Sequence, residues 1–183
     1  PTQPASGYGT LESPYQISSA AELYWFAMQA NTVKKDINAV LKNNIVVNGN
    51  VLNAAGDLSG EGARLYTWTP IDGFQGTFDG KGHTIGGLYL NDVTIDNAGL
   101  FGVNGSNGVI MNVGVTDSYF YAASKIGGVC GYNYGEISNC HNAATVGASA
   151  SSPCVGGVCG YNQSGYILNC HNTGILNADK DDG

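Results

Sequence analysis

The stretch GGVCGYN occurs at residues 127–133 and again at 156–162, and a looser copy, AGLFGVN, occurs at 98–104. The copies begin 29 residues apart in both cases. A repeated unit of this size, made of short β-type runs without a helix, is typical of one coil of a parallel β-helix. One coil cannot bury its apolar face alone, so successive coils must stack. The interval therefore predicts one turn of a solenoid.

A second register aligns four pairs of apolar residues, each pair separated by two residues: Ile85 with Leu88, Ile110 with Val113, Ile137 with Cys140 and Ile167 with Cys170. Neighbouring strands lie about 4.8 Å apart, so equal positions of successive coils come into contact. We expect an internal aliphatic stack of Ile110, Ile137 and Ile167. We also expect an amide ladder of Asn112, Asn139 and Asn169 at a turn.

The five cysteines follow the same repeat. Phe101, Cys130 and Cys159 fall on one stack, and Val113, Cys140 and Cys170 fall on another. A position that accepts Phe, Val or Cys is an apolar core position, where a free thiol behaves as a small hydrophobe. The odd count is a poor disulfide framework, and the spacings match no zinc site. Whether Cys130–Cys159 or Cys140–Cys170 forms a disulfide stays open at this point.

Composition and local pattern divide the chain into four segments. Residues 1–17 are irregular, 18–37 form a helix and its connection, 38–178 form the repeats, and 179–183 form a tail or truncation point. The helix is predicted over 18–31, where Ser19 and Glu22 have capping-box spacing. Its apolar face consists of Leu23, Phe26, Ala27 and Ala30. We predict an all-β parallel β-helix of roughly five coils, with this helix capping the N-terminal edge.

Charge and hydropathy argue against a nucleic-acid-binding protein and against a membrane-spanning one. The net charge is −7, with a single arginine and six lysines, so the chain has no basic face for nucleic acid. No apolar run approaches the ~20 residues of a membrane-spanning helix.

Three segments, FQGTFDGKGHTIGGLYL, GGVCGYNYGEISNCHNAATV and GGVCGYNQSGYILNCHNTGIL, make the chain resemble the GLUG-motif repeats of bacterial surface proteins. The resemblance covers about residues 14–178. It implies a right-handed, pectin-lyase-like β-helix in secreted or surface-anchored proteins of gut and other anaerobic bacteria. Some of these are adhesin-like, and one is an immunoglobulin A-cleaving metallopeptidase in which the repeats are accessory. His141 and His171 stand where the family often has Tyr, and no H-E-x-x-H signature is present.

We expect no catalytic residue and no cofactor. Polysaccharide lyases and hydrolases need carboxylates clustered on one face. In this chain the carboxylates are scattered and none recurs at a ladder position: Asp79, Asp92, Asp96, Asp117 and Glu136. Asp92 and Asp96 can share a loop that holds Ca²⁺, but a solvated turn is the favoured interpretation.

Two sets of residues are candidates for binding. Tyr119 and Tyr121 alternate along one strand, and Tyr132 and Tyr161 recur after GGVCG. Rows of exposed tyrosines stack on the faces of sugars. The alternative is that they pack between coils. His141 and His171 are weak candidates for a metal site, because two stacked imidazoles bind Zn²⁺ or Cu²⁺ only with a third ligand. A solvated pair inherited by duplication is favoured.

The sequence thus predicts a non-catalytic repeat module of an extracellular or surface-attached bacterial protein. Its expected role is adhesion or recognition of host or plant glycans or glycoproteins, or that of a structural spacer. We expect it to continue into further repeats or domains of a larger protein. The alternatives are a carbohydrate-active β-helix domain and the accessory region of a surface metallopeptidase.

Overall fold

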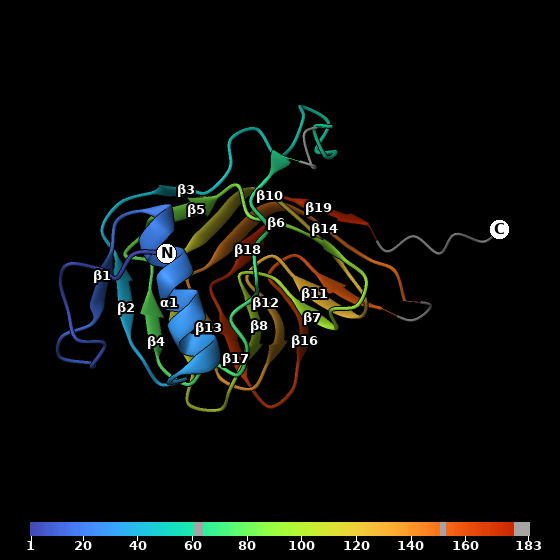
Figure 1. The fold of residues 1–183 in the computed structure, drawn as a ribbon. Coiled ribbons are helices and arrows are strands. Elements are labelled where there is room, and N and C mark those ends of the chain that lie inside the picture. The colour runs from blue at the N-terminus through green and yellow to red at the C-terminus, as the bar shows by residue number, and fades with distance from the viewer. Residues whose placement is uncertain (61–63, 151–152, 178–183) are drawn as a thin grey trace.

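The computed structural model describes residues 1–60, 64–150 and 153–177, and these form a parallel β-solenoid with a single helix, α1 (Figure 1). The chain winds repeatedly through four sheets, and every pairing between its named strands is parallel. The predicted all-β parallel solenoid is therefore confirmed. The predicted tail at 179–183 and the last repeat residue, 178, lie outside the described residues, and the four predicted segment boundaries stay a prediction.

Sheets 1 and 2 form two adjoining faces of the solenoid. Sheet 1 contains β1 (Tyr15–Ile17), β2 (Ala39–Leu41), β4 (Thr77–Asp79), β9 (Val109–Met111), β13 (Glu136–Ser138) and β17 (Tyr166–Leu168). Sheet 2 contains β3 (Ile45–Val46), β5 (Thr84–Gly86), β6 (Tyr89–Asp92), β10 (Gly114–Ala122), β14 (His141–Ala148), β18 (His171–Asn172) and β19 (Ile175–Asn177).

Sheets 3 and 4 complete each coil. Sheet 3 contains β7 (Asn97–Ala98), β11 (Lys125–Gly127) and β15 (Cys154–Gly156). Sheet 4 contains β8 (Phe101–Asn104), β12 (Cys130–Asn133) and β16 (Cys159–Asn162). Because these two sheets are three strands deep, the solenoid has about three complete turns. The predicted count of roughly five coils stays a prediction.

The predicted apolar stacks are confirmed in register. Ile137 pairs with Ile110 on one side and with Ile167 on the other. Cys130 pairs in the same way with Phe101 and Cys159. Equal positions of the repeat therefore superimpose, as the 29-residue interval predicts.

The predicted place of Ile85 in this register is wrong. Phe78 is the residue that pairs with Ile110, whereas Ile85 lies in sheet 2 and pairs with Val115. Both faces of a coil present aliphatic residues to the core at similar spacing, so the Ile-x-x-apolar pattern fits either sheet. The strand pairing, and not the pattern, decides between them.

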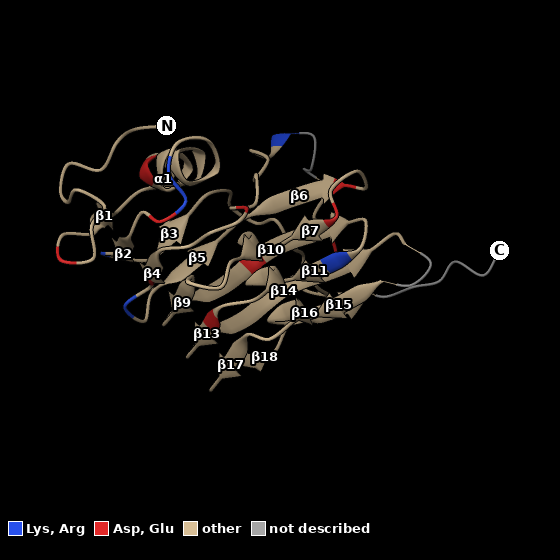
Figure 2. Ribbon diagram, turned by 90° about the horizontal axis from the view of Figure 1, so that it is seen from below, with Lys and Arg blue, Asp and Glu red and all other residues tan. Residues whose placement is uncertain are grey.

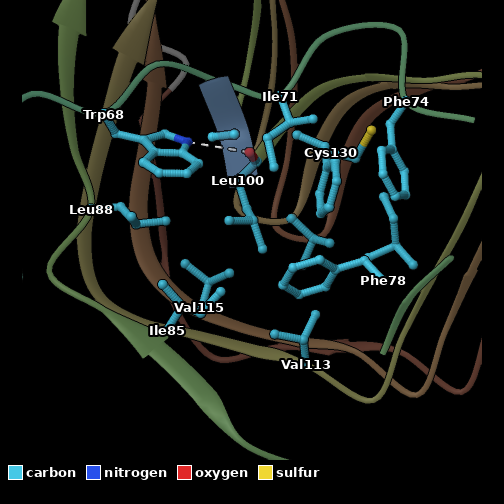
Figure 3. Close-up of a cluster of buried hydrophobic side chains, with 14 of the residues drawn as sticks. Trp68, Ile71, Phe74, Phe78, Ile85, Leu88, Leu100, Val113, Val115 and Cys130 are labelled. Carbon is cyan, nitrogen blue, oxygen red and sulfur yellow. Dashed lines mark hydrogen bonds between the residues drawn. The ribbon is translucent and has the colours of Figure 1, made fainter. Parts of the chain in front are cut away.

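Aromatic side chains fill the core of the N-terminal coils (Figure 3). The rings of Phe74 and Phe78 lie 5.0 and 5.5 Å from that of Phe101. Trp68 is fully buried, and its Nε1 donates to the carbonyl oxygens of Gly99 and Leu100 at 3.1 and 3.2 Å. In the following coils the stacks continue with smaller residues, from Phe78 to Ile110 and from Phe101 to Cys130.

The helix α1 (Ala20–Thr32) forms where the sequence predicts it, and the same four residues are buried: Leu23, Phe26, Ala27 and Ala30. Ser19 is the N-cap and accepts a hydrogen bond from the Glu22 backbone N–H at 3.3 Å. The return bond of the capping box is displaced by one residue, because the Glu22 carboxylate accepts from the backbone N–H of Ser18 at 2.7 Å. Figure 2 shows α1 at the end of the solenoid where β1 and β2 lie, opposite β17 and β18.

A buried amide ladder connects the coils through sheet 4. The Asn104 Nδ2 donates to the Asn133 Oδ1 at 2.8 Å, and the Asn133 Nδ2 donates to the Asn162 Oδ1 at 2.7 Å. Asn104 and Asn133 are fully buried. A carboxamide is suited to this position because it both donates and accepts, so each copy satisfies the next. A second such pair joins Asn142 to Asn172 at 2.8 Å. Neither ladder is among the predicted ones.

The amide ladder predicted at Asn112, Asn139 and Asn169 forms in one of its two links. The Asn139 Nδ2 donates to the Asn112 Oδ1 at 3.2 Å, and the Asn112 Nδ2 donates to the Asp79 Oδ1 at 2.9 Å. The three asparagines share φ values of +55°, +53° and +52°. Asparagine tolerates this left-handed conformation better than most residues, so backbone geometry is a second reason for the repeated asparagine.

We predict that Asn133→Ala lowers the free energy of unfolding by about 2–3 kcal/mol, because it removes four hydrogen bonds and leaves buried partners unsatisfied. Urea denaturation followed by circular dichroism measures the change. Asn107→Ala, at an exposed site of the corresponding turn in the preceding coil, is the control, and we expect a change within about 0.5 kcal/mol. Equal midpoints for the two variants would contradict a stabilising role of the ladder.

Candidate functional site

A short ladder of tyrosines lies on the outer side of sheet 4. Tyr132 of β12 pairs in register with Tyr161 of β16, and their rings are stacked with centroids 5.1 Å apart and planes at 11°. The Tyr134 ring lies 4.6 Å from that of Tyr132 at 54°. The in-register pairing of β12 and β16 superimposes the two repeated tyrosines. The structure thus brings together two of the four predicted binding residues.

A hollow of about 320 Å³ opens beside this ladder, lined by Asn97, Val103, Lys125, Tyr132 and Tyr134. The Lys125 Nζ lies 5.7 Å from the centroid of the Tyr132 ring. Lys125 comes from β11 and Tyr132 from β12, and the turn at 128–129 folds one strand back against the other. The two residues are equally far from that turn. This equal spacing on the two sides of the turn is the sequence signal that points to Lys125, which is not among the predicted site residues.

The Tyr132 phenol remains neutral over the physiological pH range. A hydrogen bond with the Tyr134 side chain, together with burial, raises the pKa of Tyr132 to about 12. The Tyr132 hydroxyl also donates to the Gln163 Oε1. Lys125 is therefore the charged side chain among the residues that line this hollow, and the other lining groups are aromatic, aliphatic or amide.

A second hollow, of about 470 Å³, adjoins the first because Tyr134 lines both. Its other lining residues include Asn107, Glu136, Ser164 and Tyr166. The Glu136 Oε1 accepts a hydrogen bond from the Ser138 hydroxyl at 2.9 Å. The two hollows share Tyr134, and one is lined by a cation, Lys125, whereas the other is lined by a carboxylate, Glu136.

The other predicted pair, Tyr119 and Tyr121, lies on sheet 2 and not beside the tyrosine ladder. Both side chains are half-buried and share one face of β10, as the alternation predicts. The Tyr119 ring stacks on that of Tyr89, with centroids 6.3 Å apart and planes at 26°. Burial raises the pKa of Tyr119. The role of this pair in ligand binding stays a prediction.

His141 and His171 stack in register, with ring centroids 5.3 Å apart and planes at 9°. Burial, followed by the repulsion of His171, lowers the pKa of His141. The His141 ring also covers Gly114, since a Cβ placed there would lie 2.1 Å from its Cε1. Within the described ranges, no three His, Cys, Asp or Glu side chains gather closely enough to hold a metal ion. The third ligand that a metal site requires is thus not among the described residues.

Several of the carboxylates have structural partners. The Asp117 carboxylate accepts hydrogen bonds from the backbone N–H groups of Val51 and Leu52 at 3.2 and 2.8 Å. Burial alone would raise the pKa of Asp79, but hydrogen bonds from Asn112 and Lys81 outweigh it and lower that pKa. Asp92 accepts from the backbone N–H and hydroxyl of Thr94, which also lowers its pKa. These bonds fix turns, and the expected lack of catalysis stays a prediction.

The five cysteines are free thiols. Cys130 and Cys140 are buried, whereas Cys154, Cys159 and Cys170 are half-buried. Cys140 and Cys170 lie in contact, since the Cys140 backbone N–H donates to the Cys170 Sγ at 3.4 Å. The hydrogen bond between these two thiols raises the pKa of Cys140 and lowers that of Cys170. The question of disulfides that the sequence left open is answered in favour of packed thiols.

The fold and the repeated ladders define the class of this chain, a parallel β-solenoid whose coils are internal repeats. Residues 122–147 match the GLUG motif, so the chain carries this motif and the predicted resemblance is confirmed. The matched segment extends from the end of β10 into β14, which is about one coil.

Two relatives extend the comparison. A protein of Evansella cellulosilytica, named as a Gly-rich membrane protein, is 33% identical over 142 residues, which cover 74% of this chain and 15% of that protein. Halomucin of Haloquadratum walsbyi is 30% identical over 141 residues, which cover 77% of this chain and 2% of that protein. The chain thus spans a small part of both. No solved structure matches. In the described part of the chain, no helix has the length and apolarity needed to cross a membrane.

We predict that a maleimide modifies Cys154, Cys159 and Cys170 in the native protein at least about 100-fold faster than Cys130 and Cys140, which are buried and react only when the fold opens. Peptide mass mapping after timed labelling measures each rate. Unfolding in urea is the control and makes all five thiols equally reactive. Rapid native labelling of Cys130, or labelling of Cys159 and Cys170 only after reduction, would contradict this arrangement.

Proposed function

We propose that this chain is a non-catalytic repeat module of an extracellular or surface-attached protein and that it recognises glycans through the tyrosine ladder of sheet 4. The relatives named as a membrane protein and a halomucin support the surface location, and the GLUG motif supports the role of a repeat module. The chain corresponds to 15% and 2% of their lengths, so further repeats or domains would accompany it in a whole protein.

The observation that most supports glycan recognition is the aromatic wall beside an open hollow. Sugar-binding surfaces need flat apolar faces, which stack on the C–H faces of a pyranose, and nearby polar groups that bond its hydroxyls. Tyr161 is 42% exposed and Tyr134 is 40% exposed, so their rings remain in contact with solvent despite their stacking. The Tyr132 and Tyr134 hydroxyls and the Asn97 amide supply donors and acceptors next to these rings.

Tyr119 and Tyr121 provide a second aromatic surface on sheet 2, but a weaker candidate. The Tyr119 ring is already stacked on Tyr89, and the Tyr121 ring lies against Gly147, where a Cβ would approach its Cδ2 to 3.0 Å. Much of each ring is therefore occupied by packing. This makes the pair a suitable control for the tyrosine ladder.

We predict that Tyr132→Ala/Tyr161→Ala weakens binding to a glycan by about 10- to 100-fold, because it removes the stacking surface at the centre of the site. The measurement is binding of the purified chain to an array of mucin glycans, plant polysaccharides and immunoglobulins. Tyr119→Ala/Tyr121→Ala is the control and leaves the affinity unchanged. If the folded chain binds nothing on the array, recognition is wrong and a structural spacer remains.

We also propose that α1 closes the N-terminal end of the solenoid, and that the stack extends beyond its three complete turns toward five coils. The Phe26 ring lies 6.1 and 5.7 Å from those of Phe74 and Phe78, which supports a helix that covers the apolar interior at this end. An uncovered solenoid end exposes unpaired backbone groups and invites association with another chain. Sheet 1 is six strands deep, and sheet 2 is five strands deep from β3 to β18. These additional strands beyond three support the count of five coils.

We predict that Phe26→Ala loosens this cap and causes self-association, in addition to a loss of about 3–5 kcal/mol of stability. Light scattering after size-exclusion chromatography, at several protein concentrations, measures the mass. Phe120→Ala is the matched control, since Phe120 is equally buried but lies in the central strand β10. It is expected to lose stability without association. The cap is wrong if both variants stay monomeric while they are folded.

A further inference from the structure

We propose that the hollow beside Tyr132 binds a single acidic sugar, with the pyranose ring against the Tyr132 side chain and its carboxylate on the Lys125 ammonium. This inference rests on the proposed glycan recognition and names its substrate class, a uronic acid or similar carboxylate-bearing monosaccharide unit.

The hollow exists because the tyrosine ladder is interrupted by a valine. Tyr132 pairs with Tyr161 on one side and with Val103 on the other, since the first copy of the repeat reads AGLFGVN where the others read GGVCGYN. Tyr161 covers one face of the Tyr132 ring. On the other side Tyr132 pairs with the smaller Val103, and both residues line the hollow together with Tyr134, whose ring lies 4.6 Å from that of Tyr132. The hollow thus lies beside the position where a third aromatic ring would continue the ladder, and a pyranose ring is similar in size to a phenol ring.

The volume limits the ligand. At about 320 Å³ the hollow lies at the lower end of the range of small-molecule pockets, roughly 300–1,000 Å³, which suits one sugar unit rather than a long segment. The Asn97 amide lines the same space, and its Oδ1 is buried without a hydrogen-bond partner among the described residues.

Lys125 selects for a negative charge. Its neighbours along sheet 3 are Asn97 and Cys154, so no like or opposite charge flanks it in register. The ion pairs in the described part of the chain join other residues, Lys34 with Asp36 and Lys81 with Asp79. The Lys125 ammonium lies 5.7 Å from the Tyr132 centroid, close enough to reach a substituent at the edge of a ring stacked on Tyr132. Figure 2 shows that charged residues are sparse over the strands, so few other charged groups would compete with Lys125 for an acidic ligand.

The second hollow sets the direction of a longer chain. Glu136 lines it, whereas Lys125 lines the first hollow, and Tyr134 lines both. Like charges repel, so an acidic unit is disfavoured beside Glu136 and favoured beside Lys125. An oligosaccharide that spans both hollows therefore places its acidic unit in the Lys125 hollow and a neutral or amino-substituted unit next to Glu136.

The test is an NMR titration of the purified chain with methyl β-D-glucuronide and with methyl β-D-glucoside. The glucuronide has a carboxylate where the glucoside has a hydroxymethyl group. We expect the glucuronide to bind about tenfold more tightly, a difference of about 1.4 kcal/mol. Added NaCl is expected to weaken binding of the glucuronide alone.

Three variants locate the site. Lys125→Gln is expected to remove the tenfold preference and leave binding of the glucoside unchanged, and Lys42→Gln, at an exposed lysine on another part of the solenoid, is the matched control. Val103→Tyr fills the hollow and extends the tyrosine ladder, so it is expected to abolish binding of both glycosides without loss of thermal stability.

The outcomes separate this inference from the proposed function. Equal binding of the two glycosides, or a preference that survives Lys125→Gln, overturns the acidic substrate but leaves glycan recognition intact. Binding that persists in Val103→Tyr overturns the hollow as the site. A third outcome is that neither glycoside binds, but the chain binds neutral glycans on the array and loses this binding in Tyr132→Ala/Tyr161→Ala. In that case the acidic substrate alone is wrong. If the array also gives nothing, both proposals fail.

Discussion

Parallel, in-register pairing of equal repeat positions is the constraint on which the rest of the structure depends. A residue at such a position lies beside a copy of itself in the next coil, so a buried side chain must be compatible with its own kind. Ile137 and Cys130 meet this condition by packing. Asn133 meets it because a carboxamide donates on one side and accepts on the other. A buried charge would face its own sign, which agrees with a charged fraction of 11%.

Features able to bind a ligand arise where this repetition fails. Val103 in place of a tyrosine opens a hollow against Tyr132. One residue further along β8, Asn104 follows Phe74 in its stack, so its Oδ1 has no amide of a preceding coil to accept from and remains buried without a partner in the described chain. Regular coils supply a rigid frame, and the irregular first copy of the repeat supplies the distinctive surface. The position of the candidate site follows from this contrast.

The sequence predicts those parts of the fold that depend on the repeat period alone. The stacks of Ile137 and Cys130 and the α1 boundaries follow from spacing and capping. The register of Ile85 does not, because aliphatic residues at similar spacing serve two different sheets. The Lys125–Tyr132 contact is still harder to predict from the sequence, since it depends on how sharply the chain turns at 128–129. Periodicity thus determines contacts between coils, whereas contacts within a coil depend on turn geometry.

The same constraint limits how many sites of this kind a solenoid can hold. Two ammonium groups one strand spacing apart repel by about 1 kcal/mol even in water. A lysine at the position of Lys125 is therefore disfavoured in consecutive coils, and its neighbours in register are uncharged. The hollow likewise requires a small residue next to Tyr132 and cannot recur while the neighbouring coils keep tyrosine. A long array of such repeats would gain multivalent binding only by alternating interrupted and regular coils, which sets the spacing between its sites.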